Sequence, residues 1–169
     1  MAYEILRPAP VVSAGIVLTV GLLVPGVIFP QTPDPAKPSD SRKQALIRFF
    51  EKNESKLVQF ADEFLQAADR HKLDWRLLPS LAMVESSGGK YYQFGNIFGW
   101  DSGRTRFSSI EDCIHHVAGR LAESPIYKGK SIQAMLTIYN PARKDYASRV
   151  TAIMRDLAPD QLALRVPVQ

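Results

Sequence analysis

A glutamate at the end of an apolar helical run is the residue of this chain best suited to acid catalysis. Glu85 follows the run 77–84, and glycines come at positions 88 and 89. In a helix, residues three, four and seven positions earlier share the face of Glu85. These residues are Leu78, Leu81 and Ala82. Desolvation on such a face favours the neutral carboxyl and raises its pKa, as a proton donor near neutral pH requires.

The segment that follows Glu85 has the composition of a cleft wall. Between residues 88 and 107 the helical period disappears, and glycines alternate with aromatic and polar side chains. We expect an irregular loop or a small β-hairpin there. Aromatic rings such as Tyr91, Tyr92 and Trp100 suit the apolar faces of sugars, although a tryptophan is more often a packing residue than a ligand contact.

Composition and charge exclude several function classes. The chain has 169 residues and a net charge of +4, but its basic residues are spread among acids, so nucleic acid is not an expected partner. Cys113 is the only cysteine, which leaves no internal disulfide and favours a buried structural thiol. His71, His115 and His116 lack the spacing of a zinc site. We expect no metal and no organic cofactor.

The first thirty residues are expected to lie in a membrane. Residues 11–29 carry no charge and are almost uninterrupted in apolar character, and about 20 such residues span a bilayer as a helix. We interpret residues 1–30 as a retained anchor, with a cleaved signal segment as the alternative. Residues 31–41 are rich in proline and predict an extended spacer. Residues 42–169 then form the folded domain.

The rest of the chain has helical periodicity almost throughout. The region from Arg42 to Leu65 predicts one bent helix or two consecutive helices, interrupted near Asn53. Asp74 is a suitable N-cap for a helix that starts at Trp75. Pro79 should then kink this helix or mark a second start.

Three further helices are expected in the second half of the chain. Ser108 and Glu111 have the spacing of a capping box at the start of one helix. Ser131 precedes a short helix, and a last helix runs from about Lys144 until Pro159 follows its end. The fold class predicted from the sequence is therefore mainly α.

Three of these segments together resemble a family. The stretch 74–86, an apolar helix ending in Glu-Ser, resembles the catalytic helix of the lysozyme-like enzymes that cleave peptidoglycan, the lytic transglycosylases and bacterial glucosaminidases. The stretch 96–99 resembles the Asn-x-Phe-Gly element of the glucosaminidase branch, and Tyr139-Asn140 resembles the Tyr-Asn pair that both branches place late in the domain. The resemblance covers roughly residues 60–157 and implies a lysozyme-like helical domain.

The resemblance also implies roles for single residues. Glu85 would be the general acid that protonates the glycosidic oxygen, and Ser86 would position the substrate or the Glu85 carboxyl. Asn96 and Phe98 would line sugar subsites, and Tyr139 would form a hydrogen bond near Glu85. Further substrate contacts are expected from Trp100 and Asn140.

The implied activity is cleavage of the β-1,4 bonds between N-acetylglucosamine and N-acetylmuramic acid. Most glycosidases need a second carboxylate beside the acid. The candidates for a partner of Glu85 in this chain are Asp101 and Asp145. Lytic transglycosylases work with one glutamate, so hydrolysis and transglycosylation both stay open. The expected partner is the glycan strand of peptidoglycan, and the chain is expected to be a monomer anchored in the cell envelope.

The sequence also allows two interpretations in which the chain is not an enzyme. One is a non-catalytic module of the same fold that binds cell-wall glycan or serves as an envelope scaffold. The other is a helical anchor protein facing the cytoplasm, because more basic residues follow the apolar segment than precede it.

Overall fold

α3 (Leu77–Ser86) is the helix that the other elements cover. A computed structural model of the chain describes residues 40–159. Within this range, seven of the ten residues of α3 are buried, as expected for a helix that is apolar on nearly all sides. Its buried residues include the three on the predicted face, Leu78, Leu81 and Ala82.

Six α-helices and two short 3₁₀ helices make up the described part of the chain, and it contains no strand. The elements are α1 (Ser41–Lys52), η1 (Val58–Phe60), α2 (Ala61–His71), α3 (Leu77–Ser86), η2 (Trp100–Gly103), α4 (Ile110–Glu123), α5 (Ile132–Tyr139) and α6 (Tyr146–Leu157). The mainly α class is confirmed. For the segment 88–107, the irregular alternative is right and the hairpin is wrong. Within the segment, the backbone forms turns, one 3₁₀ helix and a single long-range bond from the Phe107 N–H to the Phe94 carbonyl, but no strand.

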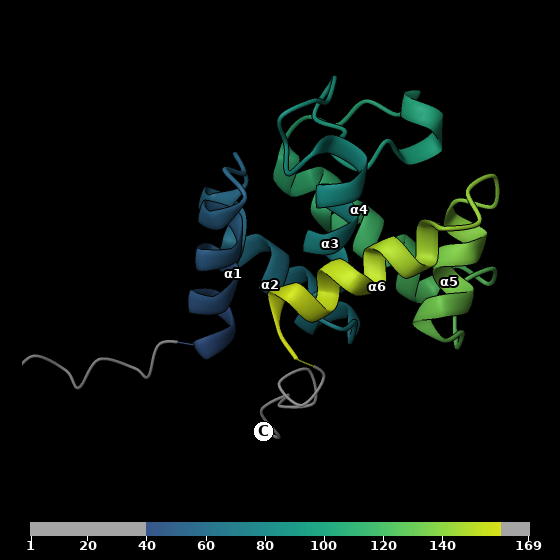
Figure 1. Cartoon of the computed structure of the whole chain (residues 1–169). Helices are drawn as coiled ribbons and strands as arrows, with labels where there is room; N and C mark the ends of the chain where they lie inside the picture. The colour runs from purple at the N-terminus through teal and green to yellow at the C-terminus, as the bar shows by residue number, and fades with distance from the viewer. Residues whose placement is uncertain (1–39, 160–169) are drawn as a thin grey trace, which may run out of the picture. The chain divides into compact units, whose positions relative to one another are not determined.

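The helices pack in pairs around α3. The most extensive contacts join α2 to α4 and α3 to α6, and α5 packs on α6. In Figure 1, α6 passes in front of α3 and reaches α5 at the right of the view. The largest side chains removed from solvent are Tyr146, Phe50, Phe64 and Phe98. α3 thus packs extensively on α6 and, to a smaller extent, on α2.

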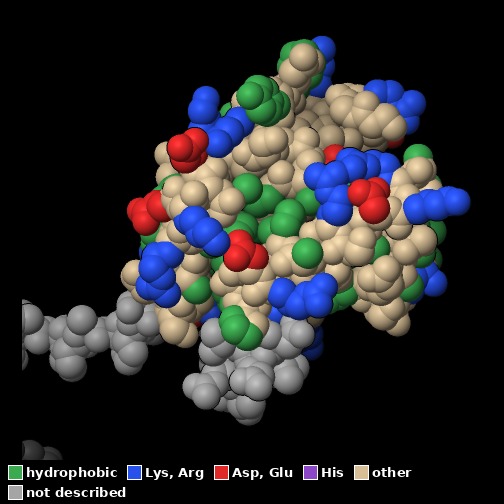
Figure 2. Space-filling model, viewed as in Figure 1, with side chains coloured by type: hydrophobic (Ala, Val, Ile, Leu, Met, Phe, Trp, Pro, Cys, Tyr) green, Lys and Arg blue, Asp and Glu red, His purple; other side chains and the backbone are tan. Residues whose placement is uncertain are grey.

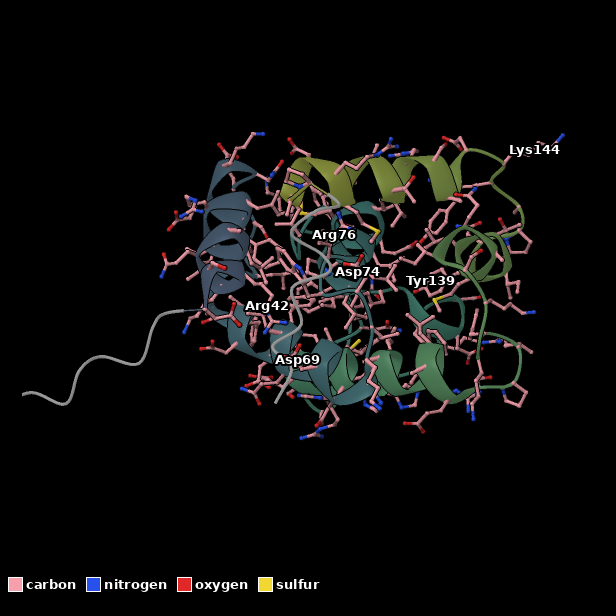
Figure 3. The ribbon with its side chains drawn as sticks, turned by 90° about the horizontal axis from the view of Figure 1, so that it is seen from below. Arg42, Asp69, Asp74, Arg76, Tyr139 and Lys144 are labelled. Carbon is pink, nitrogen blue, oxygen red and sulfur yellow. The ribbon has the colours of Figure 1, made fainter. Side chains whose placement is uncertain are left out.

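The start of α3 differs from the sequence prediction by two residues. The helix begins at Leu77, so Pro79 falls in its first turn, where a missing N–H has no intrahelical partner to lose. No kink is therefore needed. The prediction that Asp74 is the N-cap is wrong, because the N-cap position is Arg76 and no side chain caps the helix there. Asp74 Oδ1 instead accepts the Arg76 N–H at 3.0 Å in the turn before the helix. Arg76 also donates to the carbonyl of Ala158 at 2.8 Å, which ties the start of α3 to the end of α6 (Figure 3).

Other helix ends match the predictions to within a few residues. α1 and α2 are two consecutive helices, and Asn53 is the C-cap of α1. The N-cap of α4 is Ser109, which accepts the N–H of Asp112 at 3.1 Å, so the capping pair lies one residue later than predicted. Ser131 caps α5 as predicted. α6 begins at Tyr146, two residues after the predicted start.

The expected N-terminal anchor and most of the spacer lie outside the described residues. The last two residues assigned to the spacer, Asp40 and Ser41, are the N-cap and the first residue of α1. No helix in the range 40–159 has the length and apolar character needed to cross a membrane.

Charged side chains of both signs are interspersed on the surface. Figure 2 shows Lys and Arg side chains scattered over one face, with Asp and Glu among them. Several form ion pairs between helices, such as Arg42 with Asp69 at 2.7 Å (Figure 3) and Lys43 with Asp62 at 2.7 Å. Because at least one partner in each pair is well exposed, each contributes little to stability.

A tight left-handed turn follows Glu85 and requires glycine. Ser87, Gly88 and Gly89 all have positive φ, at 51°, 68° and 76°. The carbonyl of Gly88 accepts hydrogen bonds from Ser55 Oγ at 2.8 Å and from the Lys56 N–H at 3.0 Å. A Cβ atom at position 88 would lie 2.7 Å from Ser55 Oγ. The glycines therefore let the end of α3 dock closely on the loop after α1.

We expect Gly88→Ala to lower the free energy of unfolding by about 3 kcal/mol, since it adds a steric clash to the left-handed backbone. Gly129→Ala is the matched control: Gly129 has a similar φ of 74° but open space around it, so about 1 kcal/mol is expected. Urea denaturation of both variants measures the difference. Equal losses would show that the close approach at Gly88 contributes nothing.

Candidate functional site

An open cleft of about 800 Å³ contains the carboxyl of Glu85. Five parts of the chain line it: the last turn of α3, the segment 98–105, one face of α4, Tyr127 in the connection after α4, and the region around the end of α5. The lining residues besides Glu85 are Phe98, Gly99, Trp100, Asp101, Ser102, Thr105, His116, Arg120, Tyr127, Tyr139, Asn140 and Pro141.

The two oxygens of Glu85 have different surroundings. The hydroxyl of Tyr146 donates a short hydrogen bond to Oε1. Oε2 lies beside Gly99, where a Cβ atom would be 3.5 Å away, and no hydrogen bond from the described residues reaches it. One oxygen is thus held in place, while the other faces the cleft next to a residue without a side chain.

The environment of Glu85 favours its protonated form. Burial raises the pKa of this half-buried carboxyl, while the hydrogen bond from Tyr146 and the charge of Arg143 oppose that shift. Desolvation is the larger effect, so the pKa lies above its ordinary value. The carboxyl is therefore suited to hold and donate a proton.

Tyr146 is positioned by the start of α6. It is the first residue of that helix, and only 1 % of its surface is exposed. Burial, followed by the bond to Glu85, raises the pKa of its phenol, so the hydroxyl is a donor at neutral pH. Tyr139, the last residue of α5, stacks on Tyr146 with ring centroids 5.8 Å apart and planes 10° apart.

A row of aromatic rings extends from the acid along the cleft. The ring of Tyr139 also contacts Trp100 at 5.9 Å, and Trp100 meets the edge of His116 at 6.0 Å. His116 in turn lies 5.4 Å from Phe107. Of these rings, Tyr139, Trp100 and His116 line the cleft and give it a partly aromatic wall, a surface that suits the apolar faces of sugars.

Asn96 shapes the loop that carries Trp100. Its Nδ2 donates to the carbonyls of Trp100 and Thr105, both at 3.0 Å, and its Oδ1 accepts the Trp100 N–H at 2.8 Å. The side chain is 5 % exposed and does not line the cleft. The prediction that Asn96 lines a sugar subsite is therefore corrected: its amide is fully used in holding the loop.

Ser86 is also directed away from the cleft. Its hydroxyl donates to the Ala82 carbonyl at 2.9 Å and accepts the Gly89 N–H at 3.0 Å. The residue is 2 % exposed. Of the two predicted roles of Ser86, the buried hydroxyl does not fit contact with a substrate in the cleft, because it ties the last turn of α3 to the glycine turn beyond Glu85. A role in positioning the Glu85 carboxyl stays a prediction.

The other predicted site residues do line the cleft. Phe98, Trp100, Tyr139 and Asn140 all contribute to its surface. Tyr139 lies at the end of α5 directed toward the middle of the helices (Figure 3). Its hydroxyl donates to the carbonyl of Phe98 at 2.9 Å, so it fixes the cleft wall, and the bond to the acid comes from Tyr146 instead.

The candidate second carboxylates differ in position. Asp101 lines the cleft, and its partner Arg104, 2.5 Å away, holds the pKa of this carboxyl below its usual range. Asp145 is the N-cap residue of α6 and does not line the cleft. Tyr91 and Tyr92 do not line it either, and 75 % and 43 % of their surfaces are exposed.

Sequence reasoning missed the contribution of Tyr146. The sequence predicted a helix from about Lys144 but gave Tyr146 no role in the site. Its phenol was a usable signal, since a buried tyrosine hydroxyl needs a hydrogen-bond partner and a buried carboxyl offers one. His116, Arg120, Tyr127 and Thr105 were also missed, because nothing in their local sequence marks them as cleft residues.

No metal-binding cluster of His, Cys, Asp or Glu occurs among residues 40–159. Cys113 is fully buried, and burial raises the pKa of its thiol to about 11. The thiol is therefore protonated at neutral pH and poorly suited to act as a nucleophile.

Comparisons with protein-family models, with curated proteins and with solved structures find no match to this chain.

We expect Tyr146→Phe to raise the pKa of Glu85 further, because it removes a donor that stabilises the charged carboxylate. Tyr139→Phe is the control, since the Tyr139 hydroxyl donates to the carbonyl of Phe98. Carbon-13 NMR titration of the Glu85 carboxyl measures both variants. A Glu85 pKa that falls or stays constant in Tyr146→Phe would contradict the assigned hydrogen bond.

We expect Asn96→Ala to lower the free energy of unfolding by about 2 kcal/mol, because it leaves buried carbonyl groups without donors. Asn53→Ala serves as control, since the Asn53 amide makes a single hydrogen bond to the Phe49 carbonyl at 2.8 Å and should cost about 1 kcal/mol or less. Thermal unfolding compares the two. Similar small losses would mean that the Asn96 amide is free for another role.

Proposed function

We propose that this chain is a peptidoglycan glycosidase of lysozyme-like fold, which cleaves the β-1,4 bonds between N-acetylglucosamine and N-acetylmuramic acid. The observation that carries the proposal is the state of Glu85: a half-buried carboxyl with a raised pKa and one oxygen facing an aromatic-lined cleft. The Glu-Ser, Asn-x-Phe-Gly and Tyr-Asn motifs support the same function by resemblance.

Glycosidic bond cleavage needs a proton on a poor leaving group. The alkoxide that would otherwise depart is strongly basic, so a carboxylic acid that protonates the glycosidic oxygen lowers the barrier. Oε2 of Glu85 is the proton-donating atom in this proposal, since Oε1 accepts the hydrogen bond from Tyr146. That bond fixes the orientation of the carboxyl as it becomes a carboxylate and then supports the charge.

The cleft suits a carbohydrate in size and lining. Its volume of about 800 Å³ lies in the range of ordinary ligand sites. Ring surfaces from Trp100 and Tyr139 can pack on sugar faces, while Thr105, Ser102 and Asn140 can bond to hydroxyl and acetamido groups.

Two reaction outcomes are consistent with a single acid. In hydrolysis, water attacks the anomeric carbon, and Asp101 is the carboxylate of the cleft that could assist it. In transglycosylation, the 6-hydroxyl of the same sugar attacks that carbon, its proton returns to Glu85, and a 1,6-anhydro sugar is released. The products differ by one water, so their mass assigns the reaction.

The proposed substrate requires the domain to face the cell envelope. Residues 1–30 would then serve as the membrane anchor of the domain. Protease accessibility of the domain in intact spheroplasts tests this part of the proposal, and full protection would favour the cytoplasm-facing alternative.

We expect Glu85→Gln to reduce muropeptide release from isolated cell walls by at least about 100-fold, since Gln cannot donate the proton. Activity of the unchanged chain should fall as pH rises through the raised pKa of Glu85. Mass spectrometry of the released sugars measures both. Because the fold favours the protonated Glu85 carboxyl, ionisation of Glu85 above its raised pKa lowers the free energy of unfolding. The neutral Gln side chain avoids this loss, so the Glu85→Gln variant should be at least as stable as the unchanged chain at neutral pH.

Glu51→Gln is the matched control, because Glu51 is exposed on α1 and does not line the cleft; it should retain full activity. Undiminished release by Glu85→Gln would remove Glu85 from its role. Binding of glycan without any cleavage by the unchanged chain would favour the non-catalytic module.

A further inference from the structure

Arg120 and His116 form the border between two hollows on the surface of α4. Both residues line the cleft that contains Glu85. Both also line a second hollow of about 340 Å³, which continues over Glu123, Ser124 and Pro125. A polymer that leaves the cleft along this side would therefore pass directly over these two side chains.

Arg120 is the only Lys or Arg among the described residues that line the cleft. Basic residues close to the cleft have carboxylate partners: Arg104 pairs with Asp101 at 2.5 Å, and Arg143 lies 3.7 Å from Asp145. Within residues 40–159, no ion pair involves Arg120. Its exposed guanidinium is thus available to a ligand.

His116 lies next to Arg120 on α4 and offers a second polar group to the same ligand. His116 precedes it by one helical turn, so the two side chains share a face of α4. The His116 ring is held between Trp100 and Phe107. The positive charge of Arg120 acts on the phenol of Tyr127 in the same cleft. Two carboxylates, Glu85 and Asp101, line the cleft. Asp101 is already paired with Arg104.

We propose that Arg120, together with His116, forms a subsite for the carboxylate carried by N-acetylmuramic acid in the glycan strand. This inference rests on the proposed function and adds to it the feature by which the cleft distinguishes the two sugars. N-acetylmuramic acid is N-acetylglucosamine with a lactyl ether on O3, so its carboxylate is the main chemical difference between them. A guanidinium can bind such a group with two parallel hydrogen bonds.

The carboxylate can have two sources. In glycan without peptides it is the lactyl group itself, whereas in peptide-bearing strands the lactyl group is an amide and the stem peptide supplies carboxylates. Both offer the same chemistry to Arg120. The second hollow, next to Arg120 and outside the acid-containing cleft, provides room for a group that branches from the sugar.

The test is a binding measurement with the full chain carrying Glu85→Gln, so that ligands stay intact. The ligands are a peptide-free tetrasaccharide of alternating N-acetylglucosamine and N-acetylmuramic acid, the same compound with its lactyl carboxylates converted to amides, a peptide-bearing form, and chitotetraose. We expect Arg120→Gln to weaken binding of a carboxylate-bearing ligand by about tenfold. Binding of the amide and of chitotetraose should change little.

Arg48→Gln is the matched control, because Arg48 is exposed on α1 and does not line the cleft. A selective loss on the peptide-free ligand assigns the lactyl carboxylate, and a selective loss only on the peptide-bearing ligand assigns the stem peptide. Equal changes for carboxylate and amide ligands, or none, would overturn the subsite while leaving the proposed function standing. If the chain with Arg120 intact bound none of the four glycans, the proposed function would fail with it.

Discussion

The hydrogen bond from Tyr146 to Glu85 is the interaction on which the candidate site depends. It joins residues 61 positions apart and connects the last turn of α3 to the first turn of α6. A buried carboxyl and a buried phenol would each be costly alone, since a polar group without a partner loses its hydration. Paired, they hold one carboxyl oxygen in place and leave the other directed at the cleft.

The structure around this pair supports it from both sides. On the α3 side, Ser86 and the glycine turn lock the helix end onto the loop after α1. On the α6 side, Arg76 bonds to the carbonyl of Ala158 and anchors the far end of the same helix. Asn96 stabilises the part of the cleft wall formed by the segment 98–105, because its amide donates to the carbonyls of Trp100 and Thr105. The geometry of the cleft thus depends on backbone anchoring as much as on the cleft side chains.

Periodicity and capping rules predicted the helices because these depend on residues close together in sequence. The buried face of α3, the break at Asn53 and the cap at Ser131 all follow from local patterns. Local patterns do not contain the pairing of Tyr146 with Glu85, because the two residues are far apart in the sequence. They also do not contain the path of the segment 94–107, which is held by three hydrogen bonds of the Asn96 side-chain amide. Motif matching assigned Asn96 to a sugar subsite and Ser86 to the substrate or the Glu85 carboxyl, whereas both side chains bond to the backbone. The lysozyme-like resemblance itself stays a prediction.

The stack of Tyr139 on Tyr146 also makes the position of Glu85 independent of the length of a neighbouring loop. These two residues end α5 and begin α6, so the short connection between them, residues 140–145, starts and finishes at a fixed pair of rings. Asn140 and Pro141 of this connection line the cleft, so insertions there would change the rim of the cleft without displacing the Glu85 carboxyl. The shape of the opening can therefore vary through the length of this one loop, while the surroundings of Glu85 stay the same.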